Sequence, residues 1–173
     1  MAKNYRFIKS ESGLSVSTLS LTDCFSNNYS MYQLIINKLD VTASDYFYFR
    51  FIDSGGVIST NNYSFGRLNM LSNNATGGQD RSSSTSYIRL GYVGTGSDMA
   101  GGWVTNIANP YISNSNTFMF GENSSNQTSG LLYGGKMVGM YDVASQITGI
   151  QFFMGTASFN EIKVSMFGIK WVL

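Results

Sequence analysis

The feature that most constrains the fold of this chain is the run Tyr46–Ile52, in which large side chains alternate along the sequence. Because successive side chains of a β-strand point to opposite sides, its three phenylalanines would share one face, and its two tyrosines and Arg50 would share the other. The residues at 53–56, Asp-Ser-Gly-Gly, tolerate turn conformations, and Val57 and Ile58 then resume the apolar pattern. The sequence therefore predicts a β-hairpin at this point.

Apolar blocks of similar length recur along the whole chain, separated by stretches rich in Gly, Asn and Ser. The blocks lie at 14–21, 31–37, 63–70, 87–93, 103–107, 117–120, 131–143, 147–154 and 162–172. The longest polar stretch, 72–86, is predicted to be a surface loop. No segment shows a sustained helical period, and the helix-favouring residues Ala, Glu and Lys are scarce. We expect an all-β fold, an antiparallel β-sandwich of jelly-roll-like type with nine or ten strands and little helix.

The length of 173 residues corresponds to one domain, and no change of composition marks a second. We expect a single β-sandwich domain over residues 12–173. Residues 1–11 are interpreted as an N-terminal extension, because no hairpin partner for them is evident. In this interpretation Tyr5, Arg6 and Phe7 anchor the protein on a neighbour; the alternative is that the segment belongs to the sandwich.

The absence of histidine and the presence of only one cysteine, Cys24, exclude several kinds of active site. A Ser-His-Asp triad, a Cys-His pair and the common His- or Cys-based zinc sites all need residues that this chain lacks. An intramolecular disulfide is excluded for the same reason. Cys24 is interpreted as a small buried apolar residue rather than a reactive thiol. We therefore predict no catalytic residue, no metal ligand and no cofactor.

Carboxylates and one glycine-rich segment are the remaining candidates for chemistry. Asp40 with Asp45, or Asp53 with Asp98, could converge as the paired carboxylates of a glycosidase. All four fall in predicted turns, where aspartate commonly accepts backbone hydrogen bonds, and no calcium-loop spacing is present. The segment 94–102 is similar to a phosphate-binding loop but lacks the lysine and the following helix. We expect turns at these positions rather than catalytic groups.

Aromatic side chains are the main resource for binding, with eleven tyrosines, twelve phenylalanines and two tryptophans. An aromatic ring can stack on the apolar face of a sugar while neighbouring amides and carboxylates bind the sugar hydroxyl groups. The candidate ligand-binding residues are Tyr63, Tyr92, Trp103, Tyr111 and Tyr133. The alternative for each of them is that the ring packs between the sheets or at a subunit contact.

Charge and hydropathy argue against two classes of partner. Eleven basic and ten acidic residues leave a formal net charge of +1, and the basic residues are scattered, so nucleic acid is not an expected partner. No apolar run reaches the roughly 18 residues of a membrane span, so no membrane insertion is expected. The N-terminal stretch lacks the apolar run of a secretory signal, and we expect synthesis and assembly in a cytoplasm.

Several of these segments form a recognisable series. They read Leu-Ser-Val-Ser-Thr-Leu-Ser at 14–20, Asn-Asn-Tyr-Ser-Met-Tyr-Gln-Leu-Ile-Ile-Asn at 27–37, Tyr-Phe-Arg-Phe-Ile-Asp-Ser-Gly-Gly at 48–56, and then 150–153 and 162–171 near the end. The series resembles β-sandwich modules of small virion proteins of tailed bacteriophages. The resemblance implies a protein on the virion exterior, of the capsid decoration, fibre or receptor-binding type, assembled in the host cytoplasm. It supplies no catalytic residue.

Two functions follow as expectations. The first is a non-enzymatic virion structural protein that acts through contacts with other capsid or tail proteins and forms a homo-oligomer, for which the resemblance suggests a trimer. The alternative is a carbohydrate-binding module of a tail fibre or tail tip that recognises a host-surface glycan. A shallow groove with exposed aromatic rings would favour the second function, whereas a broad apolar patch would favour the first.

Overall fold

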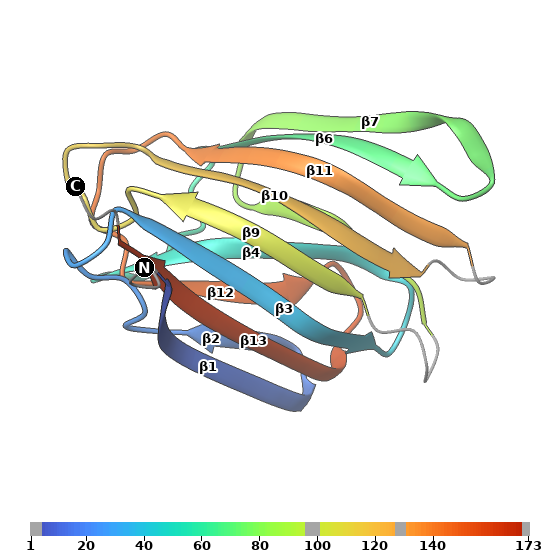
Figure 1. The fold of residues 1–173 in the computed structure, drawn as a ribbon, viewed down its shortest axis with the longest axis horizontal. Coiled ribbons are helices and arrows are strands. Elements are labelled where there is room, and N and C mark those ends of the chain that lie inside the picture. Colours follow the sequence, from blue (N-terminus) through green and yellow to red (C-terminus); the bar gives the residue numbers. More distant parts are fainter. Residues whose placement is uncertain (1–4, 96–100, 127–130, 171–173) are drawn as a thin grey trace.

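A computed structural model describes residues 5–95, 101–126 and 131–170, and within these ranges the chain forms thirteen strands and no helix. The strands make two antiparallel sheets that pack face to face (Figure 1). The prediction of an all-β antiparallel sandwich is therefore confirmed. The prediction of nine or ten strands is too low, because polar and very short segments that lack an apolar pattern also form strands.

One sheet has eight strands, and in Figure 1 it lies in front of the other, with β7 at the top and β1 at the bottom. Its order is β1 (Tyr5–Val16), β13 (Phe159–Ile169), β3 (Met31–Val41), β9 (Gly102–Ala108), β10 (Thr117–Asn126), β11 (Leu132–Tyr141), β6 (Tyr63–Leu71) and β7 (Asn74–Thr85). Three neighbouring pairs, β9–β10, β10–β11 and β6–β7, are consecutive in the chain, and the other four join strands that are not.

The second sheet has five strands. They are β2 (Thr18–Leu21), β12 (Gly149–Met154), β4 (Asp45–Asp53) and β5 (Gly56–Val57), in that order, with β8 (Ile88–Val93) also paired to β4. The last two strands of the chain each lie between early strands, β12 between β2 and β4, and β13 between β1 and β3. This return of the C-terminal strands to the N-terminal ones gives the sandwich its jelly-roll-like order.

The core lies between the sheets, and every second side chain of β4 points into it. Phe47, Phe49 and Phe51 are fully buried. The Phe47 ring packs edge-on against Trp103 of the opposite sheet, with the ring centroids 5.3 Å apart. After β4, Asp53 pairs with Gly56, whose φ of 111° requires glycine in practice. Both the predicted faces of this strand and the hairpin are confirmed.

The N-terminal segment differs from the sequence interpretation. Residues 5–11 form the first half of β1 and pair with β13, from Tyr5 opposite Ile169 to Glu11 opposite Val164, with a shift of register between Phe7 and Lys9. The boundary drawn after residue 11 therefore falls inside a strand of the sandwich. The partner of this segment is β13, the last strand of the chain. Because the two strands are far apart in the sequence, no hairpin pattern indicates their pairing. Residues 1–4 lie outside the described residues.

The polar stretch 72–86 also differs from the prediction, because most of it is strand β7 rather than a loop. It pairs with β6 from Leu71 opposite Asn74 to Tyr63 opposite Thr85. β7 has a neighbour on one side only and forms an edge of the larger sheet, where a strand needs no apolar face. In the same way β10 continues through polar residues to Asn126, beyond the apolar block at 117–120.

Candidate functional site

Two of the five predicted ligand residues belong to the core. Tyr63 is fully buried, and its hydroxyl accepts a hydrogen bond from the Phe51 amide and donates one to the Ile58 carbonyl, both at 3.0 Å. Trp103 is 1% exposed, and its indole N–H donates to the Leu90 carbonyl at 3.2 Å. Neither residue presents a ring face on which a sugar could stack in this structure.

Of the other three candidates, Tyr92 and Tyr133 lie close together, and Tyr111 belongs to a different segment. Tyr111 is half-buried and packs against the core from the segment between β9 and β10. Tyr133 in β11 is buried, and Tyr92 in β8 is half-buried. The rings of Tyr92 and Tyr133 lie 6.4 Å apart, edge to face. The structure therefore brings together these two of the five candidates.

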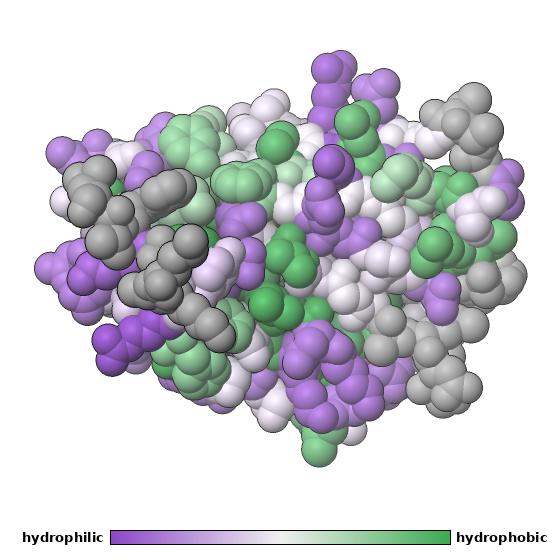
Figure 2. Space-filling view, viewed as in Figure 1, coloured by the Kyte–Doolittle hydropathy of each residue, from purple (hydrophilic) through white to green (hydrophobic). Residues whose placement is uncertain are grey.

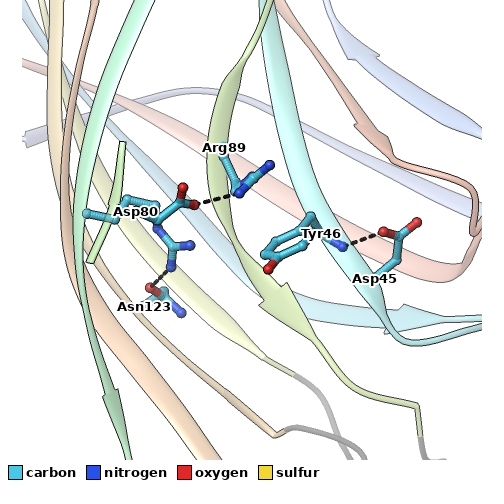
Figure 3. A network of polar contacts seen from close by, with 6 residues as sticks. Asp45, Tyr46, Asp80, Arg89 and Asn123 are labelled. Carbon is cyan, nitrogen blue, oxygen red and sulfur yellow. Dashed lines mark hydrogen bonds and ion pairs between the residues drawn. The ribbon is translucent and has the colours of Figure 1, made fainter. Parts of the chain in front are cut away.

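Tyr92 and Tyr133 form part of a polar corner, in which strands β6, β7, β10 and β11 of the larger sheet meet β8 and β4 of the smaller one. We define the polar corner by its side chains Tyr46, Arg67, Asp80, Arg89, Tyr92, Asn123 and Tyr133. Figure 3 shows Asp80, Arg89, Tyr46 and Asn123 directed into the same space. Sequence reasoning missed the two arginines, because each is an isolated cation in an apolar strand.

The two arginines of the polar corner have different surroundings. Arg89 forms an ion pair with Asp80 at 2.7 Å, and its guanidinium lies 4.1 Å from the centroid of the Tyr46 ring. Arg67 is 3% exposed, lies 5.5 Å from the Tyr133 ring centroid and donates one hydrogen bond, to Asn123 Oδ1 at 3.4 Å. Burial raises the pKa of Tyr133, and the nearby charge of Arg67 opposes that rise.

The outer face of the eight-stranded sheet is the second candidate, and it carries an unusual amount of apolar surface. Strand register aligns its side chains in rows across the sheet. One row consists of Tyr5, Ile169, Met31, Ala108, Phe118 and Met140. A second row contains Phe7, Phe167, Phe120 and Val138, with Gln33 and Asn106 in the middle. We call these two rows, with Leu68 and Val104 beside them, the outer apolar face.

Side chains of the outer apolar face reach well into solvent. Phe118 and Phe120 are each 45% exposed, and Val138 is 59% exposed. Three adjacent shallow hollows surround Val138, with volumes of about 300, 270 and 340 Å³. Figure 2, viewed from the side of this sheet, shows apolar side chains across the middle of the face with polar groups between and around them. The face therefore has both apolar projections and adjacent hollows.

The predicted anchoring residues lie at one end of this same sheet. Tyr5 and Phe7 in β1 are more than half exposed, and the Phe7 ring packs edge-on against Phe167 with centroids 5.8 Å apart. Arg6, between them, is exposed as well. By register Tyr5 and Phe7 extend the two rows of the outer apolar face. The three residues are thus a strand edge of the sandwich and not a separate arm.

Two of the aspartates considered as catalytic pairs, Asp45 and Asp53, bind backbone amides, and Asp40 lies inside strand β3 and not in the predicted turn. Asp53 accepts a hydrogen bond from the Gly55 amide at 2.8 Å, and Asp45 accepts one from the Ala157 amide at 3.0 Å. Asp40 accepts a long hydrogen bond from Asn160. Asp98, and with it most of the segment 94–102, lies outside the described residues. Across the ranges that the structure describes, no cluster of three metal-ligating side chains occurs.

The comparisons with known proteins add no assignment. No protein-family model matches this sequence, and no curated protein is significantly similar to it. Within the described ranges, no helix is long and apolar enough to cross a membrane.

Proposed function

We propose that this chain is a non-enzymatic structural subunit whose outer apolar face packs against a second copy of the chain. The observation that carries the proposal is the pair of mainly apolar rows that run from β1 across β13, β3, β9 and β10 to β11 in the eight-stranded sheet. Monomeric proteins rarely leave contiguous apolar patches of more than a few hundred Å² in water. A partner that covers this face removes that surface from solvent and stabilises the assembly.

The size of the face fits a stable interface. Eight strands about 4.8 Å apart and about ten residues long give the whole outer surface of this sheet an area of roughly 1,100 Å², of which the outer apolar face is a part. A standard interface covers about 800 Å² on each partner. The charges on this surface include the ion pair between Glu122 and Lys136 at 3.2 Å.

The projecting side chains and the hollows of the outer apolar face suit association between copies of the chain. Val138, Phe118 and Phe120 project, and the hollows beside them are floored in part by Gly66 and Gly121. A symmetric interface places the same patch on both partners, so that projections of one copy fill hollows of the other. The aliphatic and aromatic side chains available are of the kind that fill such pockets at interfaces.

A bacteriophage virion is the setting that we propose for this assembly, on the strength of the sequence resemblance. There the subunit would lie on the particle exterior, as a capsid decoration or fibre protein, with capsid or tail proteins as further partners. Packing of the same face on two copies gives a two-fold dimer, so the trimer that the resemblance suggests would need a further, different contact between copies. Mass spectrometry of purified virions, with and without protease treatment of the intact particles, tests both the presence of the protein and its exposure.

The first test of the assembly is the molar mass in solution. Light scattering over a concentration series is expected to show an oligomer for the wild type, and Val138→Lys is expected to dissociate it. Val57→Lys is the matched control, because Val57 is an exposed valine of the five-stranded sheet. A monomeric wild type at all concentrations contradicts the proposal. An oligomer that persists in Val138→Lys, with unchanged thermal stability, contradicts the choice of face.

Glycan recognition is the second candidate, and the exposure of the Tyr46 ring favours it. Tyr46 is 37% exposed, lies beside Tyr92 with ring centroids 5.2 Å apart, and is backed by Arg89. Exposed aromatic rings beside charged hydrogen-bonding groups suit sugar binding. A glycan-array signal that disappears in Tyr46→Ala but not in Tyr5→Ala would support this function. The absence of any signal from an oligomeric sample contradicts it.

A further inference from the structure

The guanidinium of Arg67 is enclosed in the sandwich with most of its hydrogen-bonding capacity unused. Arg67 is 3% exposed, and neither its Nε nor its Nη1 has a hydrogen-bond partner. The hydrogen bond from its Nη2 to Asn123 Oδ1 is long, at 3.4 Å. Of the carboxylates that the structure describes, none lies within 4.0 Å of this side chain. The Tyr133 side chain is the other polar group against it, and a buried guanidinium whose Nε and Nη1 lack partners is stabilised by a further acceptor.

Two neighbouring donors share this condition. Asn123 is also buried, and its Nδ2 has no partner. The Nε of Arg89 has none either, although the other end of that guanidinium bonds Asp80. The unused groups are therefore all N–H donors on three side chains of the polar corner. Because two arginines face one aspartate there, the corner also carries a net positive charge.

Aromatic rings lead from solvent to this cation. Tyr46 is the exposed member, Tyr92 lies 5.2 Å from it, and Tyr133 lies 6.4 Å from Tyr92. The Arg67 guanidinium lies 5.5 Å from the Tyr133 ring centroid. Rings of this kind give a wall of low polarity, which strengthens the attraction between the arginine and an anion and excludes competing water.

We propose that the polar corner binds one small anion, a halide or a carboxylate, between Arg67 and Asn123. Such an anion accepts from the unused Nε or Nη1 of Arg67 and from Nδ2 of Asn123 and balances the excess positive charge. The carboxylate can belong to a free ion such as formate or to an acidic sugar whose ring stacks on Tyr46 or Tyr92. This site lies between the sheets and is separate from the outer apolar face.

The test uses thermal unfolding of the purified full-length protein in increasing sodium formate or sodium bromide. Ligand binding to the folded state raises Tm with concentration. The difference in Tm between the wild type and Arg67→Met is expected to increase by several degrees over the series, because the variant lacks the guanidinium that binds the anion. General salt effects act on both proteins and cancel in this difference. Arg81→Met is the control, since Arg81 is an exposed arginine in the edge strand β7. A difference that does not change with anion concentration overturns the proposal.

Two further arms complete the test. Sodium glucuronate is compared with glucose at equal concentration and ionic strength. A rise in Tm for glucuronate that Arg67→Met abolishes assigns the carboxylate to a sugar, and a rise in Tm for formate alone assigns it to a free ion.

Crystals of the wild type soaked in bromide are expected to show an anomalous peak within hydrogen-bond distance of Arg67 and Asn123. This experiment uses only the wild type, so it tests the anion site even if Arg67→Met does not fold. An ordered water and no bromide between Arg67 and Asn123 overturns the proposal.

Discussion

The carboxylate of Asp45 accepts a hydrogen bond from the amide of Ala157, 112 residues further along the chain, at a distance of 3.0 Å. The same carboxylate also accepts from the amide and hydroxyl of Thr156. Asp45 begins β4, and Thr156 and Ala157 lie in the turn between β12 and β13. This side chain therefore ties the turn that leads into the larger sheet to the start of a strand in the smaller one.

Acid is expected to weaken this tie. Burial raises the pKa of Asp45, but the backbone donors together lower it further, so the net pKa lies below its ordinary value of 3.8. The stability that the carboxylate contributes is therefore present above pH 3.8 and is lost as pH falls through the lower folded-state pKa. Asp45→Asn should cost about 1 kcal/mol at neutral pH, because the group is partly solvated. Urea unfolding at several pH values measures this.

The control for that experiment is Asp142→Asn, which changes an exposed aspartate. Its unfolding free energy should match that of the wild type at neutral pH. The gap between Asp45→Asn and the wild type should narrow as pH falls below 3.8. A gap that stays constant down to strongly acidic pH would show that the charge of Asp45 does not contribute to stability.

Removing one hydroxyl from the core should be costly at Tyr63. Tyr63→Phe leaves the Phe51 amide and the Ile58 carbonyl without their partner in a site closed to water. An unsatisfied buried group of this kind costs about 1–3 kcal/mol. Chemical denaturation measures the loss, and Tyr5→Phe, at an exposed ring, serves as the control. Equal stability of the two variants would contradict the assigned role of the Tyr63 hydroxyl.

Two glycines of the larger sheet should respond differently to an added methyl group. A Cβ at Gly121 would lie 2.4 Å from the Val104 carbonyl oxygen, which belongs to the adjacent strand and cannot move freely. A Cβ at Gly66 would meet only the Val138 side chain, at 3.6 Å. Gly121→Ala should therefore destabilise the fold by about 1–3 kcal/mol, and Gly66→Ala should be tolerated. Thermal unfolding of the two variants side by side distinguishes them.

The single thiol should be unreactive in the folded protein. Cys24 is 1% exposed, and burial raises the pKa of its thiol to about 12. Since the thiolate is the reactive form, labelling with a thiol-specific reagent at pH 8 should be very slow for the native protein and rapid in denaturant. Rapid stoichiometric labelling under native conditions would mean that the segment between β2 and β3 opens readily.

Sequence patterns predicted those parts of the fold in which local chemistry decides the outcome. The alternation in Tyr46–Ile52 gave the two faces of β4, and Asp53 to Gly56 gave the hairpin after it. β7 and the first half of β1 were missed, because an edge strand is held by backbone hydrogen bonds to one neighbour and needs no apolar pattern. Their partners β6 and β13 supply the pattern that these segments lack.

The candidate sites were harder to predict. An aromatic residue in a strand has the same local sequence signature whether its ring faces the core, as at Trp103, or solvent, as at Phe118. The consecutive residues Phe118, Met119 and Phe120 are all large and apolar, so nothing local indicates that Met119 enters the core and the phenylalanines remain outside. Arg67 is similar: its burial depends on Asn123 and Tyr133, which belong to other strands.

The sequence by itself determined the all-β class and the exclusion of histidine-based sites and of an intramolecular disulfide, because these depend on residue types and on the two-residue period of a strand. Only the tertiary structure decided which strands pair, which apolar faces remain in solvent, and which cation is enclosed without a carboxylate partner. Those outcomes depend on contacts between strands far apart in the sequence, such as β1 with β13, and no local pattern encodes such contacts.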